Sequence, residues 1–182
     1  MATYIALFRG INVGGKNTLS MKALARILEE HGYAGVKTYI QSGNVVFQCP
    51  HTKAKEFSRI IGEAITNSRG FQPEILLLRA SELKTSVDAN PFPEAEAEPK
   101  SLHLFFLADT PKHPDLEALH RLRVNSESFK LVGKVFYLHA PDGVGRSKLA
   151  MQSEKLIGVP ATARNWNTVT KLLEMAQSSG MT

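Results

Sequence analysis

A basic, glycine-containing loop at residues 143–148 is the part of this sequence best suited to binding an anion. It supplies Arg146, Ser147 and Lys148 immediately before an amphipathic stretch that predicts a helix. The free backbone amides and the positive dipole end of a helix start attract phosphate, and two neighbouring cations strengthen that attraction. The alternative is a helix capped by Ser147 with solvated charges, and the residue types favour neither interpretation.

Residues 10–17 nearly match a phosphate-binding loop, because they follow a predicted strand and have the required glycine and lysine spacing. Asn17 stands where a serine or threonine should ligate Mg²⁺, and the predicted helix starts at Met21 rather than directly after the lysine. Loops of this class also need a parallel sheet, which the order of elements does not predict. We therefore predict a mainly structural turn, and a weaker alternative is an anion held without metal by Arg9, Asn12 and Lys16.

Amide side chains at two further turns complete the set of candidate ligand-binding groups. Gln41 and Asn44 flank a glycine in a tight turn. Turn chemistry alone explains these residue types, and the functional alternative is that the amides face a base edge or a sugar. Arg164, Asn165 and Asn167 precede the last amphipathic helix. One asparagine is expected to cap that helix, and the guanidinium to bind an internal or external carboxylate.

Histidine and cysteine are too scattered in the sequence to predict a metal site or a catalytic centre. The six histidines and Cys49 show no metal-ligand spacing. Ser147 and Lys148 are adjacent, and adjacent side chains generally point apart, so they do not predict a nucleophile paired with a base. We predict no metal and no cofactor, and the sequence leaves open whether the protein is an enzyme.

The elements that must position these residues follow one pattern twice. In the first half, β-forming runs alternate with stretches of helical periodicity in the order strand, helix, hairpin, helix, strand. After residue 100 the same order returns, and a terminal helix is added. The predicted fold class is α+β, with two tandem ferredoxin-like βαββαβ units, mostly antiparallel sheets covered on one face by helices, and a C-terminal helix.

A change of composition marks the boundary between the two predicted units. Residues 90–99 contain three prolines and three glutamates but neither strand nor helix periodicity. This composition is typical of a linker. The predicted domains are therefore residues 1–89 and 101–182, joined by a linker at residues 90–100.

Composition and charge restrict the class of protein. No apolar run approaches the ~20 residues that cross a bilayer, no secretory signal precedes the first strand, and one cysteine cannot form an internal disulfide. We expect a cytoplasmic protein without membrane contact. The net charge of +5 mildly favours anionic partners. Residues 1–99 carry 11 basic and 10 acidic side chains and residues 100–182 carry 11 and 7, so the second half is more basic.

Four segments of the chain closely resemble a bacterial family, the domain of unknown function 1697. They are FRGINVGGKN (residues 8–17), TYIQSGNVVF (38–47), GRSKL (145–149) and ARNWNTVTKLLEM (163–175). Several long matching segments in the same order along a chain are a far more specific signal than one short motif. The resemblance implies a duplicated α+β fold and no established activity.

The leading functional hypothesis is a binding protein. The polar, glycine-containing segments are mostly turns and helix starts, where rigid scaffolds present binding groups. We expect them to line a groove between the two units that holds a phosphate-bearing ligand, either a nucleotide or a nucleic acid. The alternatives are a small transferase or hydrolase acting on a phosphorylated metabolite, and a self-associating structural or regulatory module. The oligomeric state is left open.

Overall fold

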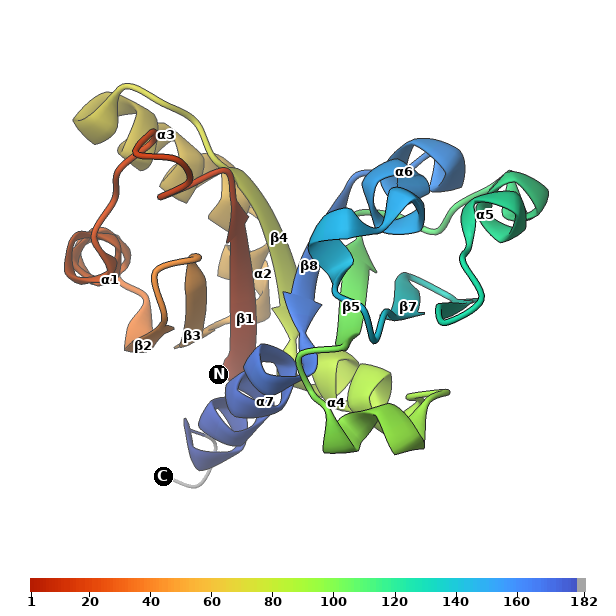
Figure 1. The fold of residues 1–182 in the computed structure, drawn as a ribbon. Helices are drawn as coiled ribbons and strands as arrows, with labels where there is room; N and C mark the ends of the chain where they lie inside the picture. Colours follow the sequence, from red (N-terminus) through yellow and green to blue (C-terminus); the bar gives the residue numbers. More distant parts are fainter. Residues whose placement is uncertain (180–182) are drawn as a thin grey trace. The chain divides into compact units, whose positions relative to one another are not determined.

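The computed structural model describes residues 1–179, which form two four-stranded antiparallel sheets with helices between the strands (Figure 1). Contacts between residues divide the chain into two compact units. Unit 1 contains residues 1–85 and the C-terminal residues from Lys171, and unit 2 contains Ser86–Thr170. Residues 171–179, which the sequence analysis assigned to the second unit, group with the first. Residues 180–182 of that predicted unit lie outside the described residues.

Unit 1 has the predicted order of elements, with one short helix, α2 (His51–Ala54), added after the hairpin. The other elements are β1 (Ala2–Arg9), α1 (Met21–Glu30), β2 (Ala34–Tyr39), β3 (Asn44–Cys49), α3 (Phe57–Arg69) and β4 (Glu74–Arg79). The strands lie in the order β2-β3-β1-β4, and each neighbouring pair is antiparallel. β1 is therefore a central strand, with the β2–β3 hairpin on one side and β4 on the other.

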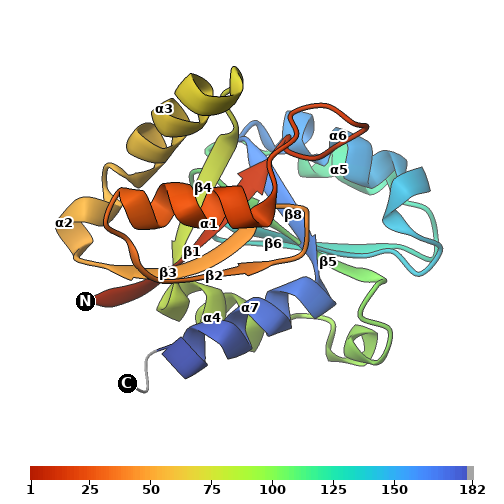
Figure 2. The ribbon, with the colours of Figure 1, turned by 90° about the vertical axis from the view of Figure 1, so that its left-hand side faces the viewer.

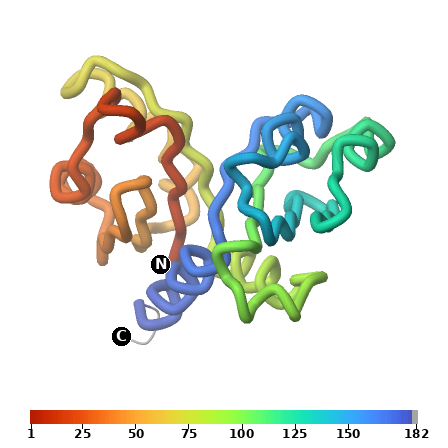
Figure 3. The backbone as a smooth tube through the Cα atoms, in the orientation of Figure 1, coloured from red at the N-terminus to blue at the C-terminus, as the bar shows by residue number. Residues whose placement is uncertain are grey.

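Unit 2 repeats this order, and the path of the chain can be followed in Figure 3. Its elements are η1 (Pro93–Ala97), β5 (Leu102–Leu107), α5 (Leu116–Leu122), β6 (Ser128–Val132), β7 (Val135–His139), η2 (Val144–Arg146), α6 (Lys148–Ile157) and β8 (Ala161–Asn165). Two helices, α4 (Ala80–Asp88) and α7 (Trp166–Ser179), carry the chain from one unit to the other. None of the described helices combines the length and apolar character needed to span a bilayer.

The strand order β6-β7-β5-β8 is the same permutation as in unit 1. Each unit is thus a βαββαβ motif whose first strand lies between the third and fourth, which is the ferredoxin-like arrangement. The predicted fold class, with two tandem α+β units and a C-terminal helix, is confirmed. It follows from two sequence periods, one of two residues in the strands and one near 3.6 in the helices.

The helices of unit 1 cover one face of its sheet because apolar residues of both element types share one core. Figure 2 shows α1 and α3 on this face. The rings of Phe47 on β3 and Phe57 on α3 stack with their centroids 4.5 Å apart. The other fully buried members include Ala6, Leu24, Leu28, Val45, Ile61 and Ile65. Burial of one such large side chain contributes roughly 1.5–3 kcal/mol to stability.

The helices of unit 2 form an equivalent core. Phe105 and Phe136 meet edge to face with their ring centroids 5.5 Å apart, and Leu119 of α5 and Leu149 of α6 pack against them. The backbone N–H of Asp115 donates to the Leu156 carbonyl at 2.8 Å, which ties the start of α5 to the end of α6. This bond holds the two helices side by side.

The second face of each sheet is also buried, whereas the sequence predicted a helical cover on one face only. In unit 1, Gln48 Nε2 donates to the Ser179 carbonyl at 2.5 Å, so the end of α7 reaches this face. In unit 2, Tyr137 Oη donates to the Ser86 carbonyl at 2.8 Å. The segment predicted as a linker continues from there as η1, in which Ala95 is buried. It packs as part of unit 2 because apolar side chains lie between its prolines.

Candidate functional site

A groove between α5 and α6 in unit 2 is lined by cationic and apolar side chains. It has a volume of about 540 Å³ and is lined by Ala118, Arg121, Leu122, Lys148, Met151, Gln152, Lys155 and Leu156. Three of these eight residues are cations, and none is acidic. We call it the α5–α6 groove.

The sequence positions Lys148 in this groove through the cap of α6. Ser147 Oγ accepts a hydrogen bond from the Ala150 N–H at 2.9 Å, so Lys148 becomes the first residue of the helix. Lys148, Met151, Gln152 and Lys155 then recur at the spacing of one helix face. Ser147 itself is buried and occupied as the cap. The capping interpretation of Ser147 is therefore the one that the structure supports.

The cations of the groove are exposed and lightly paired. Arg121 lies 3.6 Å from Glu117, and the two side chains are 68% and 90% exposed, so this pair contributes little and leaves the guanidinium able to move. The side chains of Lys148 and Lys155 have no hydrogen-bond or ion-pair partner among residues 1–179. Arg146 lies in η2 and is exposed, outside the lining of the groove. Of the predicted basic loop, only Lys148 reaches it.

Sequence reasoning identified Lys148 but missed Arg121, Gln152 and Lys155. A usable signal existed for two of them, because Gln152 and Lys155 follow Lys148 at i+4 and i+7 on a predicted helix. Arg121 had no such signal. It joins the groove only because α5 packs beside α6, which is a tertiary contact.

In unit 1, the loop at residues 10–17 and the turn at residues 41–44 come together through Asn12. Its side-chain Nδ2 donates to the carbonyls of Leu19 at 2.8 Å and Gln41 at 2.9 Å, and its Oδ1 accepts from the Leu19 N–H at 2.8 Å. Both amide hydrogens are used, and Asn12 adopts a left-handed φ of 56°. This side chain stabilises the loop and has no donor left for a ligand.

Other predicted groups in unit 1 are also occupied by the protein itself. Asn44 is fully buried, and its Nδ2 donates to the Tyr39 carbonyl and to Ser42 Oγ, each at 3.0 Å. Arg9 Nη1 lies 3.2 Å from Glu74. The Lys16 and Gln41 side chains are exposed and make no hydrogen bond or ion pair within residues 1–179. The loop is thus held together by its own hydrogen bonds, with α1 starting at Met21 and an antiparallel sheet beside it. Anion binding by Arg9 and Lys16 stays a prediction.

The residues around the start of α7 do not share the α5–α6 groove. Asn165 Oδ1 accepts from the Thr168 N–H at 3.0 Å, so it is the predicted cap. Ala163 lies on the same face of the sheet as α6, and Arg164 therefore points to the opposite face. Burial lowers the pKa of Arg164 to about 10. Asn167 is exposed and lines a separate hollow of about 390 Å³ with Gly143.

The predicted residues therefore fall into separate groups within each unit. Their convergence on a shared groove between the units stays a prediction. Within residues 1–179 there is no group of three or more His, Cys, Asp or Glu side chains that is able to hold a metal ion. The lining of the α5–α6 groove also contains no serine, cysteine, histidine or carboxylate, so lysine is the one type of common nucleophilic or acid–base group in it.

Comparison with known proteins supports the fold and identifies the family. The structure is similar to that of a conserved bacterial protein from Streptococcus pneumoniae, with a TM-score of 0.67 and 23% sequence identity. The match covers 96% of this chain and 98% of that chain, and at this identity it shows a shared fold alone. No curated protein matches the sequence. The family model described as "Protein of unknown function (DUF1697)" matches residues 1–137, and the chain therefore belongs to this family.

Proposed function

We propose that this protein binds a phosphate-bearing ligand, either a nucleotide or a segment of nucleic acid, in the α5–α6 groove of unit 2. The observation that carries the proposal is the set of residues that line the groove, with three cations, no acid and four apolar side chains in one hollow. Cations that share a concave surface produce a positive potential, which attracts anions. The carboxylate paired with Arg121, that of Glu117, lies outside the lining and is 90% exposed, so it neutralises the groove only weakly.

The phosphate end of the ligand belongs near Lys148 and Lys155. These residues stand at i and i+7 on α6, so a bound phosphate is flanked by ammonium groups from the same helix face. The position of Lys148 at the first turn of α6 adds the favourable end of the helix dipole. Arg121 closes the opposite wall from α5 and is able to donate two parallel hydrogen bonds to one phosphate.

The base or sugar end of the ligand belongs over the apolar part of the lining. Leu122, Leu156 and Met151 provide this surface, and Met151 is 63% exposed at its rim. A polarizable thioether packs well against aromatic rings. Gln152 adds an amide that both donates and accepts hydrogen bonds, as the polar edge of a base requires. The volume of about 540 Å³ lies within the usual range for small-ligand sites.

The test compares the wild type with Lys148→Glu/Lys155→Glu by fluorescence anisotropy, using a labelled nucleotide and a labelled single-stranded oligonucleotide at low salt. The charge reversals should weaken binding by about tenfold or more. Lys130→Glu is the matched control, because Lys130 is exposed on β6 and alternates with Phe129 and Leu131, which face the helices. It should bind as the wild type does.

The two ligand sources differ in their dependence on salt. Affinity for an oligonucleotide should fall steeply as salt rises because several counterions are released, whereas affinity for a single nucleotide should fall less. Absence of binding for both probes in the wild type, or equal binding by the wild type and the double variant, would contradict the proposal.

A further inference from the structure

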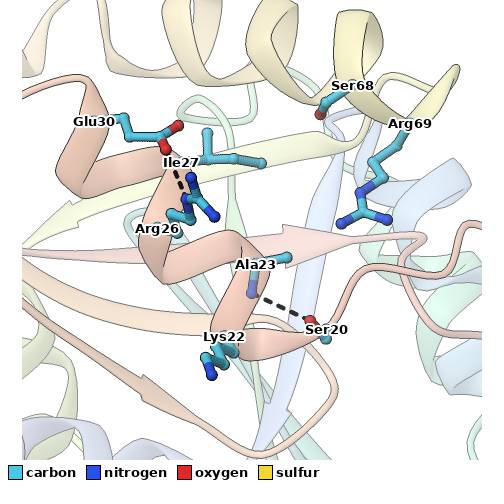
Figure 4. A pocket seen from close by; sticks show the side chains of 8 residues that line it. All are labelled: Ser20, Lys22, Ala23, Arg26, Ile27, Glu30, Ser68 and Arg69. Carbon is cyan, nitrogen blue, oxygen red and sulfur yellow. Dashed lines mark hydrogen bonds and ion pairs between the residues drawn. The ribbon is translucent and has the colours of Figure 1, made fainter.

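A second groove lies between the equivalent helices of unit 1, and nothing in the sequence analysis pointed to it. It has a volume of about 440 Å³ and is lined by Ser20, Lys22, Ala23, Arg26, Ile27, Glu30, Ser68 and Arg69 (Figure 4). Six of these residues come from the start and face of α1, and two come from the end of α3. We call it the α1–α3 groove.

The two grooves occupy the same place in the repeated fold. α1 and α5 each follow the first strand of a unit, and α3 and α6 each precede the fourth. Both grooves contain three cations, contributed by both helices. Arg26 and Arg121 are each the sixth residue of their helix, whereas the other cations stand at different positions of α1, α3 and α6. The recurrence of this chemistry in both units is a reason to interpret it as functional.

The guanidinium groups of Arg26 and Arg69 face the α1–α3 groove from opposite walls. Figure 4 shows the Arg69 side chain reaching from the end of α3 toward the start of α1, while Lys22 extends away from it. The Arg69 side chain makes no hydrogen bond or ion pair within residues 1–179. Arg26 Nε donates to Glu30 Oε1 at 2.7 Å, and these two side chains are 78% and 55% exposed. Glu30 is the only acid in the lining and partly neutralises Arg26.

We infer that the α1–α3 groove binds a phosphate group between Arg26 and Arg69, as a second anion site that is independent of the α5–α6 groove. Guanidinium groups match phosphate oxygens through paired hydrogen bonds, and two of them on facing walls are able to clamp one anion. Ser68 lies on the same wall as Arg69, but its hydroxyl already donates to the Ala64 carbonyl at 2.8 Å, so the donors on this wall come from Arg69.

The ligand class differs from that of the α5–α6 groove. The apolar residues of the α1–α3 groove are limited to Ala23 and Ile27, whereas the α5–α6 groove has two leucines, an alanine and an exposed methionine. The α1–α3 groove provides little surface for a base. The geometry therefore favours recognition of the phosphate group itself, as in inorganic phosphate or a phosphate monoester.

The experiment is a titration of ¹⁵N-labelled full-length protein with inorganic phosphate, followed by amide chemical shifts. It uses the Lys148→Glu/Lys155→Glu background, so that the α5–α6 groove is silenced. Amides near the start of α1 and the end of α3 should shift in a saturable way. Arg69→Gln should weaken this binding by about fivefold or more, because one clamp residue is removed.

Two further variants make the test specific. Glu30→Gln removes the competing carboxylate and should tighten phosphate binding by about twofold to fivefold, a gain that general damage to the fold does not produce. Arg59→Gln is the matched control on α3. Its partners are Glu56 and Glu63, and it lies outside the groove lining, so it should leave the phosphate affinity unchanged.

The outcomes separate this inference from the proposed function. Shifts at α5 and α6 in the wild type without any at α1 and α3 would refute the second site and leave the first intact. Saturable shifts at α1 and α3 that Arg69→Gln weakens would establish the second site whatever the α5–α6 groove binds. Shifts that persist equally in Arg69→Gln and Glu30→Gln would overturn the inference.

Discussion

The two units close their central hairpins in different ways, although their strand orders are identical. In unit 1, a Cβ on Gly43 would lie 2.6 Å from Ile11 Cδ1 and 2.7 Å from Phe8 Cβ, and the turn is tied to the loop at residues 10–17 through Asn12. In unit 2, a Cβ on Gly133 would have no described heavy atom within 4 Å. One topology therefore tolerates either a packed hairpin turn or an open one.

The packed turn also holds backbone strain that the open turn does not. Ile40 has a φ of 46°, which is unfavourable for a β-branched residue, and the residue is 49% exposed. Strain of this kind persists where the surroundings fix the conformation. In unit 1, the polar side chains of the loop at residues 10–17 and of the turn at residues 41–44 therefore serve mainly to hold that loop and turn together. The cations of both grooves come instead from helix surfaces, which have no distinctive sequence motif.

The largest expected effect is that of adding one methyl group to the packed turn. Gly43→Ala should destabilise the protein by about 3 kcal/mol or more, because the φ of 81° disfavours alanine and the new Cβ overlaps the Ile11 and Phe8 side chains. Gly133→Ala, with a φ of 56° and open space, should lower stability by only about 1 kcal/mol. Urea denaturation followed by circular dichroism measures both, and equal losses would remove the contrast.

The second-largest effect is expected from removing the Asn12 amide, which joins the loop at residues 10–17 to the turn at residues 41–44. Asn12→Gly keeps access to the left-handed φ but removes three hydrogen bonds, and we expect a loss of about 2 kcal/mol. Asn17→Gly also relieves a left-handed residue but removes only the bond to the Gly10 carbonyl. Its loss should be about 1 kcal/mol or less. Similar free energies of unfolding for the two variants would show that Asn12 is not the link.

Two buried tyrosines give a smaller difference between the units. Tyr137 Oη donates to the Ser86 carbonyl, whereas Tyr33 Oη has no hydrogen-bond partner within the described residues. Tyr137→Phe should therefore cost about 1 kcal/mol, and Tyr33→Phe should be neutral or slightly stabilising. Thermal unfolding at pH 7 measures the stability of both variants. A larger loss of stability for Tyr33→Phe than for Tyr137→Phe would contradict the expectation that only the Tyr137 hydroxyl is hydrogen-bonded.

The same tyrosines make stability depend on alkaline pH. Burial raises the pKa of each hydroxyl to about 12 from an ordinary value of 10.0. The unfolded chain therefore releases these protons first as the pH rises above about 10, so stability is lost between about pH 10 and 12. The Tyr33→Phe/Tyr137→Phe variant should show a shallower loss in urea denaturation over this range.

The smallest effect concerns His103 in unit 2. Burial lowers the pKa of its imidazole, and Nδ1 has no hydrogen-bond partner among the described residues. The unfolded chain then takes up the proton first as pH falls below about 6.5, so acid lowers the stability of the folded protein. His103→Phe should reduce the drop in melting temperature between pH 7.5 and 5.5. An unchanged drop would mean that other groups determine it.

The fold was predictable from sequence because periodicity is a local signal. The spacing of apolar residues predicted the strands of both sheets and the helices that pack on them, including α1 and the β2–β3 hairpin. It missed α4, where only Leu83 is buried and the apolar stripe is correspondingly weak. It also missed η1, because proline-rich composition masked the burial of Ala95.

The candidate site was less predictable because side-chain partners are not local. Asn12 has the residue type of a ligand-binding amide, and its bond to the Gln41 carbonyl becomes visible only once the loop meets the turn. Lys148 was identified from its place before a helix. Arg121, Arg26 and Arg69 reach their grooves through the packing of helix on helix, which no short motif encodes.

The return of the C-terminal segment to unit 1 has a consequence for synthesis on the ribosome. Unit 2 is one continuous stretch, Ser86–Thr170, and all of it is translated before Lys171. Unit 1 is discontinuous, and the bond from Gln48 to the Ser179 carbonyl cannot form before residue 179 has been translated. The unit whose strands are made first is thus completed after the other unit, and one face of its sheet lacks its C-terminal helix until then.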